Sequence, residues 1–199
     1  MKLPTKQECY MLLKKYKTPD NVVLHIEAVT KVGVTIAKAL EEKGLDVDVE
    51  VVERACLLHD MVRQVSFSDF SKVDPDLVAI YEEQKKKYGE LGHKKAAEVI
   101  LKEEGYPELG HVVRLHGFVE FGTDEGPKTW EEKILNYADK RVRHETIVGL
   151  IDRIDDIVER HKDRFPDSGD LAEEKKKLFI ELEKELFNKL DLKPSDLND

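Results

Sequence analysis

The chain has 199 residues, enough for one domain with a sizeable core, and its formal net charge is −9. This acidic balance argues against a protein that binds nucleic-acid backbones, which normally presents a basic face. No apolar run reaches the ~18 residues of a membrane span, and the first residues lack the apolar core of a signal peptide. The two cysteines, Cys9 and Cys56, cannot form a disulfide framework, so we expect a cytoplasmic protein without a membrane partner.

Helical periodicity dominates the sequence, and no stretch shows a convincing strand pattern. In chain order the pattern predicts helices at residues 5–16, 20–43, 48–60, 75–88, 91–104, 107–116, 129–143, 147–160 and 171–190. Thr129 is a candidate N-cap with Glu132 as its capping-box partner. Three glycines and a proline at 117–128 indicate a surface loop or a lid. The lysine runs at 85–87 and 175–177 are interpreted as solvated helix faces.

The predicted fold is all-α, with a helical core at residues 1–164 and a C-terminal helical extension and tail at 165–199. A boundary near Arg164-Phe165-Pro166 separates the two, and the extension is too short to fold alone. We expect it to pack on its own core or on a second subunit in a homodimer. The sequence leaves that choice open.

Two histidines lie on the apolar stripes of predicted helices, where an isolated imidazole is poorly placed. His25 follows Val22 by three residues, and His59 follows Cys56 by three. A buried neutral histidine with satisfied hydrogen bonds is the ordinary alternative for either one. Asp60, which follows His59 directly, favours a ligand role, because a carboxylate beside an apolar face needs a cation or several donors.

Asp139 repeats this pattern at the end of the apolar segment ILNYAD, with a salt bridge to a neighbouring Lys or Arg as the alternative. His93 begins one predicted helix and His116 ends the apolar run VVRLHG. Either histidine alone would be read as a capping or surface residue. The candidate ligands are His25, His59, Asp60, His93, His116 and Asp139. The remaining histidines are interpreted as surface residues, namely His111, His144 and His161.

Four imidazoles and two carboxylates suit a borderline divalent metal and do not suit calcium. Iron or manganese is favoured, and cobalt, nickel or zinc is compatible with the same ligands. Six ligands exceed the number that one tetrahedral site holds, so two metal ions are expected.

The order H…HD…H…H…D on a helical chain resembles the HD-domain superfamily of metal-dependent phosphohydrolases, over roughly residues 21–145. The segments GELGHKKAAEVI, VVRLHGF and YADKRV further resemble the binuclear branch, which includes bacterial diadenosine tetraphosphate hydrolases. The resemblance implies one metal ion held by His25, His59, Asp60 and Asp139, and a second held by His93 and His116, with Asp60 bridging both.

The chain departs from the dinucleotide hydrolases after two of these ligands. Lys140-Arg141 follow Asp139, where those enzymes continue with an apolar stretch and a Glu. Gly117-Phe118 follow His116, where they tend to have a Thr. The dinucleotide substrate therefore does not follow from the resemblance.

The expected function is hydrolysis of a phosphate ester or a nucleotide by a hydroxide that bridges two metal ions. The metals lower the pKa of bound water from ~15.7 to roughly 7 and neutralise charge on the phosphate. Asp60 is the bridging carboxylate, and Arg63 and Lys140 are candidate phosphate contacts, with ordinary surface ion pairs as the alternative. By the resemblance, Arg63 lies where many members carry a basic residue.

Two other functions compete with hydrolysis. Some HD-superfamily members use a similar ligand order in di-iron oxygenases, although basic residues beside two ligands favour a phosphate substrate. A non-catalytic helical module stabilised by metal, or a regulator of a partner protein, is the second alternative. The complete set of six ligands argues against that reading.

Overall fold

The computed structural model describes residues 1–160 and 168–198, and this part of the chain is mostly helical, which confirms the predicted all-α class. The helices are α1 (Lys6–Lys15), α2 (Asp20–Glu42), α3 (Val49–Leu58), α4 (Pro75–Tyr88), α5 (Gly92–Glu103), α6 (Pro107–Arg114), α7 (Trp130–Asp139), α8 (Leu150–Arg160) and α9 (Ser168–Phe187). Short 3₁₀ helices lie at Arg63–Ser66, Gly89–Leu91 and Pro194–Asn198. None of the helices in the described ranges is both long and apolar enough to cross a membrane.

Local sequence signals set the beginnings of several helices. Thr129 and Glu132 form the predicted capping box at the start of α7, and Thr5 and Glu8 form another at the start of α1. The Asp48 side chain accepts hydrogen bonds from the first backbone amides of α3. These bonds satisfy backbone N–H groups that a helix leaves free at its first turn.

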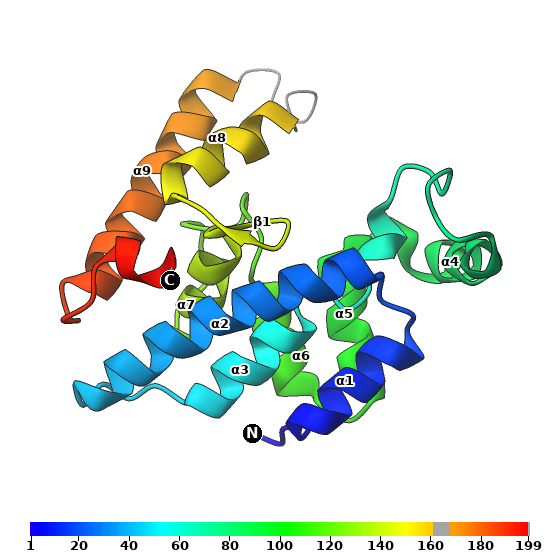
Figure 1. The fold of residues 1–199 in the computed structure, drawn as a ribbon, viewed down its shortest axis with the longest axis horizontal. Coiled ribbons are helices and arrows are strands. Elements are labelled where there is room, and N and C mark those ends of the chain that lie inside the picture. Colours follow the sequence, from blue (N-terminus) through cyan, green and yellow to red (C-terminus); the bar gives the residue numbers. More distant parts are fainter. Residues whose placement is uncertain (161–167, 199) are drawn as a thin grey trace.

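The long helix α2 lies at the centre of the molecule and packs against α3 and α7, while α5 packs against α6 (Figure 1). Gly33 lies where α2 meets both neighbours. A Cβ atom at this position would lie 2.6 Å from Cys56 Sγ and 3.7 Å from Ala138 Cβ. The absence of a side chain at Gly33 therefore permits the close approach of α2, which carries His25, of α3, which leads into His59, and of α7, which ends at Asp139.

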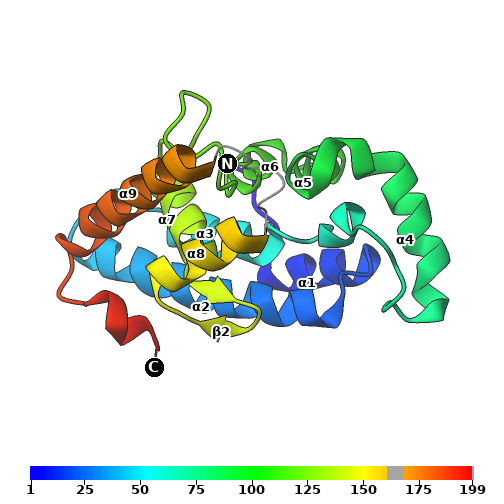
Figure 2. The same ribbon diagram turned by 90° about the horizontal axis from the view of Figure 1, so that it is seen from above.

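The C-terminal helices α8 and α9 pack against one another, and α9 contacts α7 (Figures 1 and 2). Phe179 of α9 is fully buried and stacks on Phe121, with ring centroids 4.3 Å apart. Lys175 is also buried, and its ammonium donates a hydrogen bond to the Phe121 carbonyl. The prediction that Lys175 lies on a solvated face is therefore wrong, since α9 turns this residue onto the 117–128 loop. The boundary predicted near 164–166 lies outside the described residues.

The chain after α7 differs from the prediction. The helix ends at Asp139 instead of Arg143, and the antiparallel strands β1 (Val142–Arg143) and β2 (Thr146–Ile147) follow. Arg141 is 2% exposed, and its guanidinium donates to the Val148 and Pro194 carbonyls. These tertiary bonds stabilise a turn of the chain that helical periodicity alone does not reveal.

Candidate metal centre

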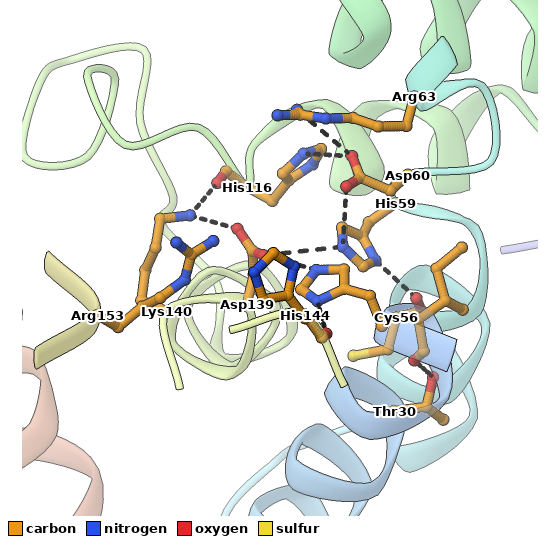
Figure 3. A network of polar contacts seen from close by, with 12 residues as sticks. Thr30, Cys56, His59, Asp60, Arg63, His116, Asp139, Lys140, His144 and Arg153 are labelled. Carbon is orange, nitrogen blue, oxygen red and sulfur yellow. Dashed lines mark hydrogen bonds and ion pairs between the residues drawn. The ribbon is translucent and has the colours of Figure 1, made fainter. Parts of the chain in front are cut away.

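His59 and Asp60 lie just beyond the C-terminal end of α3, in the interior of the molecule. His59 is completely buried, and its Nδ1–H donates to the Cys56 carbonyl at 2.8 Å (Figure 3). This bond fixes the tautomer in which Nε2 carries a lone pair. Nε2 of His59 and Oδ1 of Asp60 are both buried without a hydrogen-bond partner among the described residues.

His25 reaches the same place from the first turns of α2. Its Nδ1–H donates to the His144 carbonyl at 2.8 Å, and its Nε2 lies 3.2 Å from Asp139 Oδ1. When Nδ1 donates, a neutral Nε2 and a carboxylate oxygen both present lone pairs. A proton or a metal ion is therefore needed to make this contact favourable. His144 adopts a positive φ of 58° in the turn between β1 and β2, and its carbonyl accepts the hydrogen bond from His25 (Figure 3).

His116 and His93 approach Asp60 from the other side. His116 Nδ1–H donates to the Val113 carbonyl at 2.6 Å. Its buried Nε2 has no hydrogen-bond partner within residues 1–160 and 168–198 and lies 3.6 Å from Asp60 Oδ1. His93 Nε2 lies 3.4 Å from the same oxygen. Arg63 Nη1 donates to His93 Nε2 at 2.7 Å, so a guanidinium contacts the same nitrogen that faces Asp60.

Asp139 closes the site from the end of α7. Its Oδ1 faces His25 and His59, at 3.2 and 3.9 Å from their Nε2 atoms, whereas its Oδ2 accepts a hydrogen bond from Lys140 at 2.5 Å. The Lys140 ammonium is buried and also donates to the His116 carbonyl at 2.8 Å. Lys140 therefore connects the end of α7 to the chain segment that carries His116.

The candidate ligand atoms form two groups that share Asp60. His25, His59 and Asp60 offer one group, and Asp60, His93 and His116 offer the other, with the atoms of each group within 4.8 Å of one another. Three of these atoms are buried without a hydrogen-bond partner in the described part of the chain, which costs free energy unless a cation is present. The nitrogen and oxygen donors fit borderline divalent metals.

The environment also sets the protonation states that a metal requires. Burial lowers the pKa of His59 to about 4 and lowers the pKa of His93 well below its usual value, so both imidazoles are neutral near pH 7. Burial by itself would raise the pKa of Asp60, but Arg63 and the nearby histidines outweigh it and hold this pKa well below the ordinary range. Neutral imidazoles and ionised carboxylates are the forms that bind metal ions.

Several contributors to this centre carry no sequence signal. His144 is exposed, as predicted, but its backbone carbonyl orients His25. Ser66 Oγ lies 3.1 Å from His93 Nδ1. His111 has a side chain that is 55% exposed and lies beside Glu98, away from the cluster. His161, also interpreted as a surface residue, lies outside the described residues. The His144 group that contacts His25 is a backbone carbonyl, which every residue type carries. Periodicity and motif spacing therefore do not reveal this contact.

Comparison with known proteins agrees with this geometry. The HD domain family matches residues 22–155, and the chain belongs to this family of helical domains. The family suggests metal-dependent hydrolase activity. An uncharacterized protein of Methanocaldococcus jannaschii is 28% identical over 158 residues, which cover 73% of this chain and 78% of the relative. No solved structure matches the chain.

Proposed function

We propose that the protein is a phosphohydrolase that uses two divalent metal ions to hydrolyse a phosphate ester or a nucleotide. One observation carries this proposal. Buried nitrogen and oxygen atoms from separate helices converge on Asp60, and His59 Nε2, His116 Nε2 and Asp60 Oδ1 have no hydrogen-bond partner in the described residues. Such atoms are costly in a stable interior unless a cation satisfies them.

The sharing of Asp60 supports the assignment of two metal positions. The proposed ligands of the first metal are His25, His59, Asp60 and Asp139, and those of the second are His93, His116 and the same Asp60. Backbone carbonyls hold Nδ1 of three of these histidines, which leaves Nε2 directed toward the centre. Two divalent ions bound in this way supply a water molecule that loses its proton near neutral pH.

Two cationic side chains are proposed to bind the phosphate group. Arg63 lies beside Asp60 and His93, and its side chain is 38% exposed, so its guanidinium is accessible to a substrate. Lys140 donates two hydrogen bonds to the protein, and an ammonium group has three donors. Its third N–H remains for an anion. Iron or manganese is the proposed native metal.

The first experiment is elemental analysis of protein purified without chelators, followed by a phosphatase screen with added manganese. We expect about two metal ions per chain, the count of a two-metal site, and release of phosphate. Asp60→Ala is expected to abolish metal binding and activity, whereas His111→Ala, which removes a histidine outside the cluster, retains both. An Asp60→Ala variant with full metal content would refute the ligand assignment. Two iron ions without phosphate release would instead favour the oxygenase.

A further inference from the structure

A pocket of about 790 Å³ lies between the turn that joins α1 to α2 and the segment that leads into α4. Lys17 and Thr18 of the turn line one side of it, and residues 67–77 together with Tyr81 of α4 line the other. The described residues that line this pocket include none of the six candidate metal ligands, and neither Arg63 nor Lys140. The pocket is therefore separate from the centre described above.

Apolar and aromatic side chains reach this pocket from several elements of the chain. Leu13 comes from α1, Val23 from α2, Phe67 from the segment before α4, and Leu77 and Tyr81 from α4 itself. Pockets of roughly 300–1,000 Å³ that combine such walls with a few polar groups are typical of sites for small molecules. The volume and the walls therefore fit a small organic molecule with an apolar body.

Three lysines line the same pocket, namely Lys14, Lys17 and Lys72. All three are exposed, and none of their ammonium groups forms an ion pair or a hydrogen bond with residues 1–160 and 168–198. Lys15, the neighbour of Lys14, differs because it forms an ion pair with Glu104 at 2.6 Å. In a chain with a net charge of −9, three lysines without ion-pair partners at one pocket provide local positive charge that attracts an anion.

Three carboxylates also line the pocket, but each has a role in the local backbone. Asp69 accepts a hydrogen bond from the Ser71 amide at 2.9 Å, and Asp74 caps α4 by accepting one from the Asp76 amide at 3.0 Å. Asp20 lies in the first turn of α2, where the helix dipole favours an acidic side chain. These carboxylates support turns and helix starts, whereas the lysines have no comparable structural role.

The backbone of Lys17 is the second unusual feature of the pocket. Its φ is 55°, in the left-handed region that a residue with a Cβ atom disfavours. The ends of α2 and α5 have the same pattern of hydrogen bonds as the end of α1, but Gly44 and Gly105 occupy the corresponding position there, as is usual. The Tyr81 hydroxyl donates to the Lys17 carbonyl at 2.7 Å and holds this turn against α4. A lysine that replaces the favoured glycine indicates a role for its side chain.

We infer that this pocket is a second ligand site, for a small molecule that has an apolar body and one anionic head group. The body lies against the apolar side chains of α4 and of the segment before it, and the head group contacts the three ammonium groups. Hydrogen bonds between an ammonium group and an anion are charge-assisted, and burial of the apolar body adds affinity. The inference goes beyond the proposed function and does not depend on it, because no metal ligand takes part.

Two probes with the same apolar body test this site. Naphthalenesulfonate carries an anionic head group, and naphthyl methyl sulfone carries a neutral head group of similar shape. Neither probe contains a phosphate ester, so a phosphohydrolase does not consume it. Isothermal titration calorimetry with the full chain measures both affinities. We expect wild type to bind the sulfonate about fivefold or more tightly than the sulfone, because only the sulfonate pairs with the lysines.

Lys17→Gly removes one ammonium group and supplies the residue that this backbone favours. It should weaken sulfonate binding by about threefold or more without lowering the melting temperature. Combining it with Lys14→Gln and Lys72→Gln should abolish the preference for the sulfonate. The matched control is Lys38→Gln, which removes an exposed lysine of α2 outside the pocket and should leave the affinity within about twofold. Leu77→Trp fills the pocket and should weaken the binding of both probes.

Equal affinities of wild type for the two probes would overturn the inference, as would a Lys17→Gly variant that binds the sulfonate as tightly as wild type. Asp60→Asn, which alters the carboxylate shared by the proposed metal positions, should bind the sulfonate within about twofold of wild type. Loss of binding in this variant would place the probe at the metal centre and would also overturn the inference. Wild type that contains no metal and releases no phosphate would refute the proposed function alone.

Discussion

Gly33 offers a direct test of how the helices that carry the site are held together. In Gly33→Ala the new Cβ would lie 2.6 Å from Cys56 Sγ and 3.3 Å from Val52 Cγ1, both on α3. Alanine favours a helix interior over glycine by ~1 kcal/mol. Overpacking of a tight core costs typically ~1–3 kcal/mol. Cys56 is fully buried, and because protein interiors are close-packed, its sulfur can move only by displacing its neighbours.

The clash is therefore expected to exceed the gain in helix propensity. A contact of 2.6 Å is shorter than Cβ atoms normally make, so the overpacking cost lies at the upper end, ~2–3 kcal/mol. After the gain in helix propensity, we expect Gly33→Ala to lower the free energy of unfolding by about 1–2 kcal/mol, and the melting temperature by roughly 2–8 °C for a chain of this size. Urea denaturation followed by circular dichroism measures the change. The unfolding midpoint should fall while the slope stays constant, because only stability changes.

A double-mutant cycle with Cys56→Ala identifies the cause. Cys56→Ala alone should cost about 1 kcal/mol through loss of a buried sulfur. In that background the sulfur is gone, so Gly33→Ala should become neutral or stabilising, with a coupling of at least ~1 kcal/mol. The reasoning would be refuted if Gly33→Ala were as stable as wild type, or if it destabilised both backgrounds equally.

Three further predictions concern the surroundings of the centre. Asn136→Ala removes hydrogen bonds to the buried carbonyls of Leu115 and Gly117 on either side of His116. It should lower the free energy of unfolding by ~1–3 kcal/mol and weaken metal binding. Denaturation curves and metal titrations identical to those of wild type would contradict this. Phe179→Ala removes the stack on Phe121 and should lower the free energy of unfolding by ~3–5 kcal/mol and speed proteolysis of the 117–128 loop. Unchanged proteolysis of this loop would show that α9 does not hold it. Burial would raise the pKa of Glu104, but hydrogen bonds from the Lys15 ammonium and the Tyr16 hydroxyl outweigh it and lower this pKa in the folded protein, so the stability that these bonds contribute above pH ~4.3 is lost as the pH falls through the folded pKa. Glu104→Gln should therefore make the melting temperature less dependent on pH between about pH 5 and 3. Identical pH dependence in wild type and variant would exclude the effect.

The sequence by itself determined the helical class and most helix positions. Apolar periodicity reports which face of a helix is buried, and capping signals such as Thr129 with Glu132 are local, so both can be read without knowledge of the fold. The positions of His59 and Asp60 at the end of an apolar helix likewise predicted a polar group in the interior, and the structure places both there. The ligand roles of the six residues stay a prediction.

The tertiary structure decided how these residues meet. Asp60 lies between two sets of histidines because α2 and α3 approach closely at Gly33, a distance that periodicity does not contain. The same holds for the end of α7, where Arg141 bonds to carbonyls distant in sequence, and for Lys175, which packs on the 117–128 loop. Such contacts depend on which faces of different helices pack together, and a local pattern specifies a buried face but not its partner.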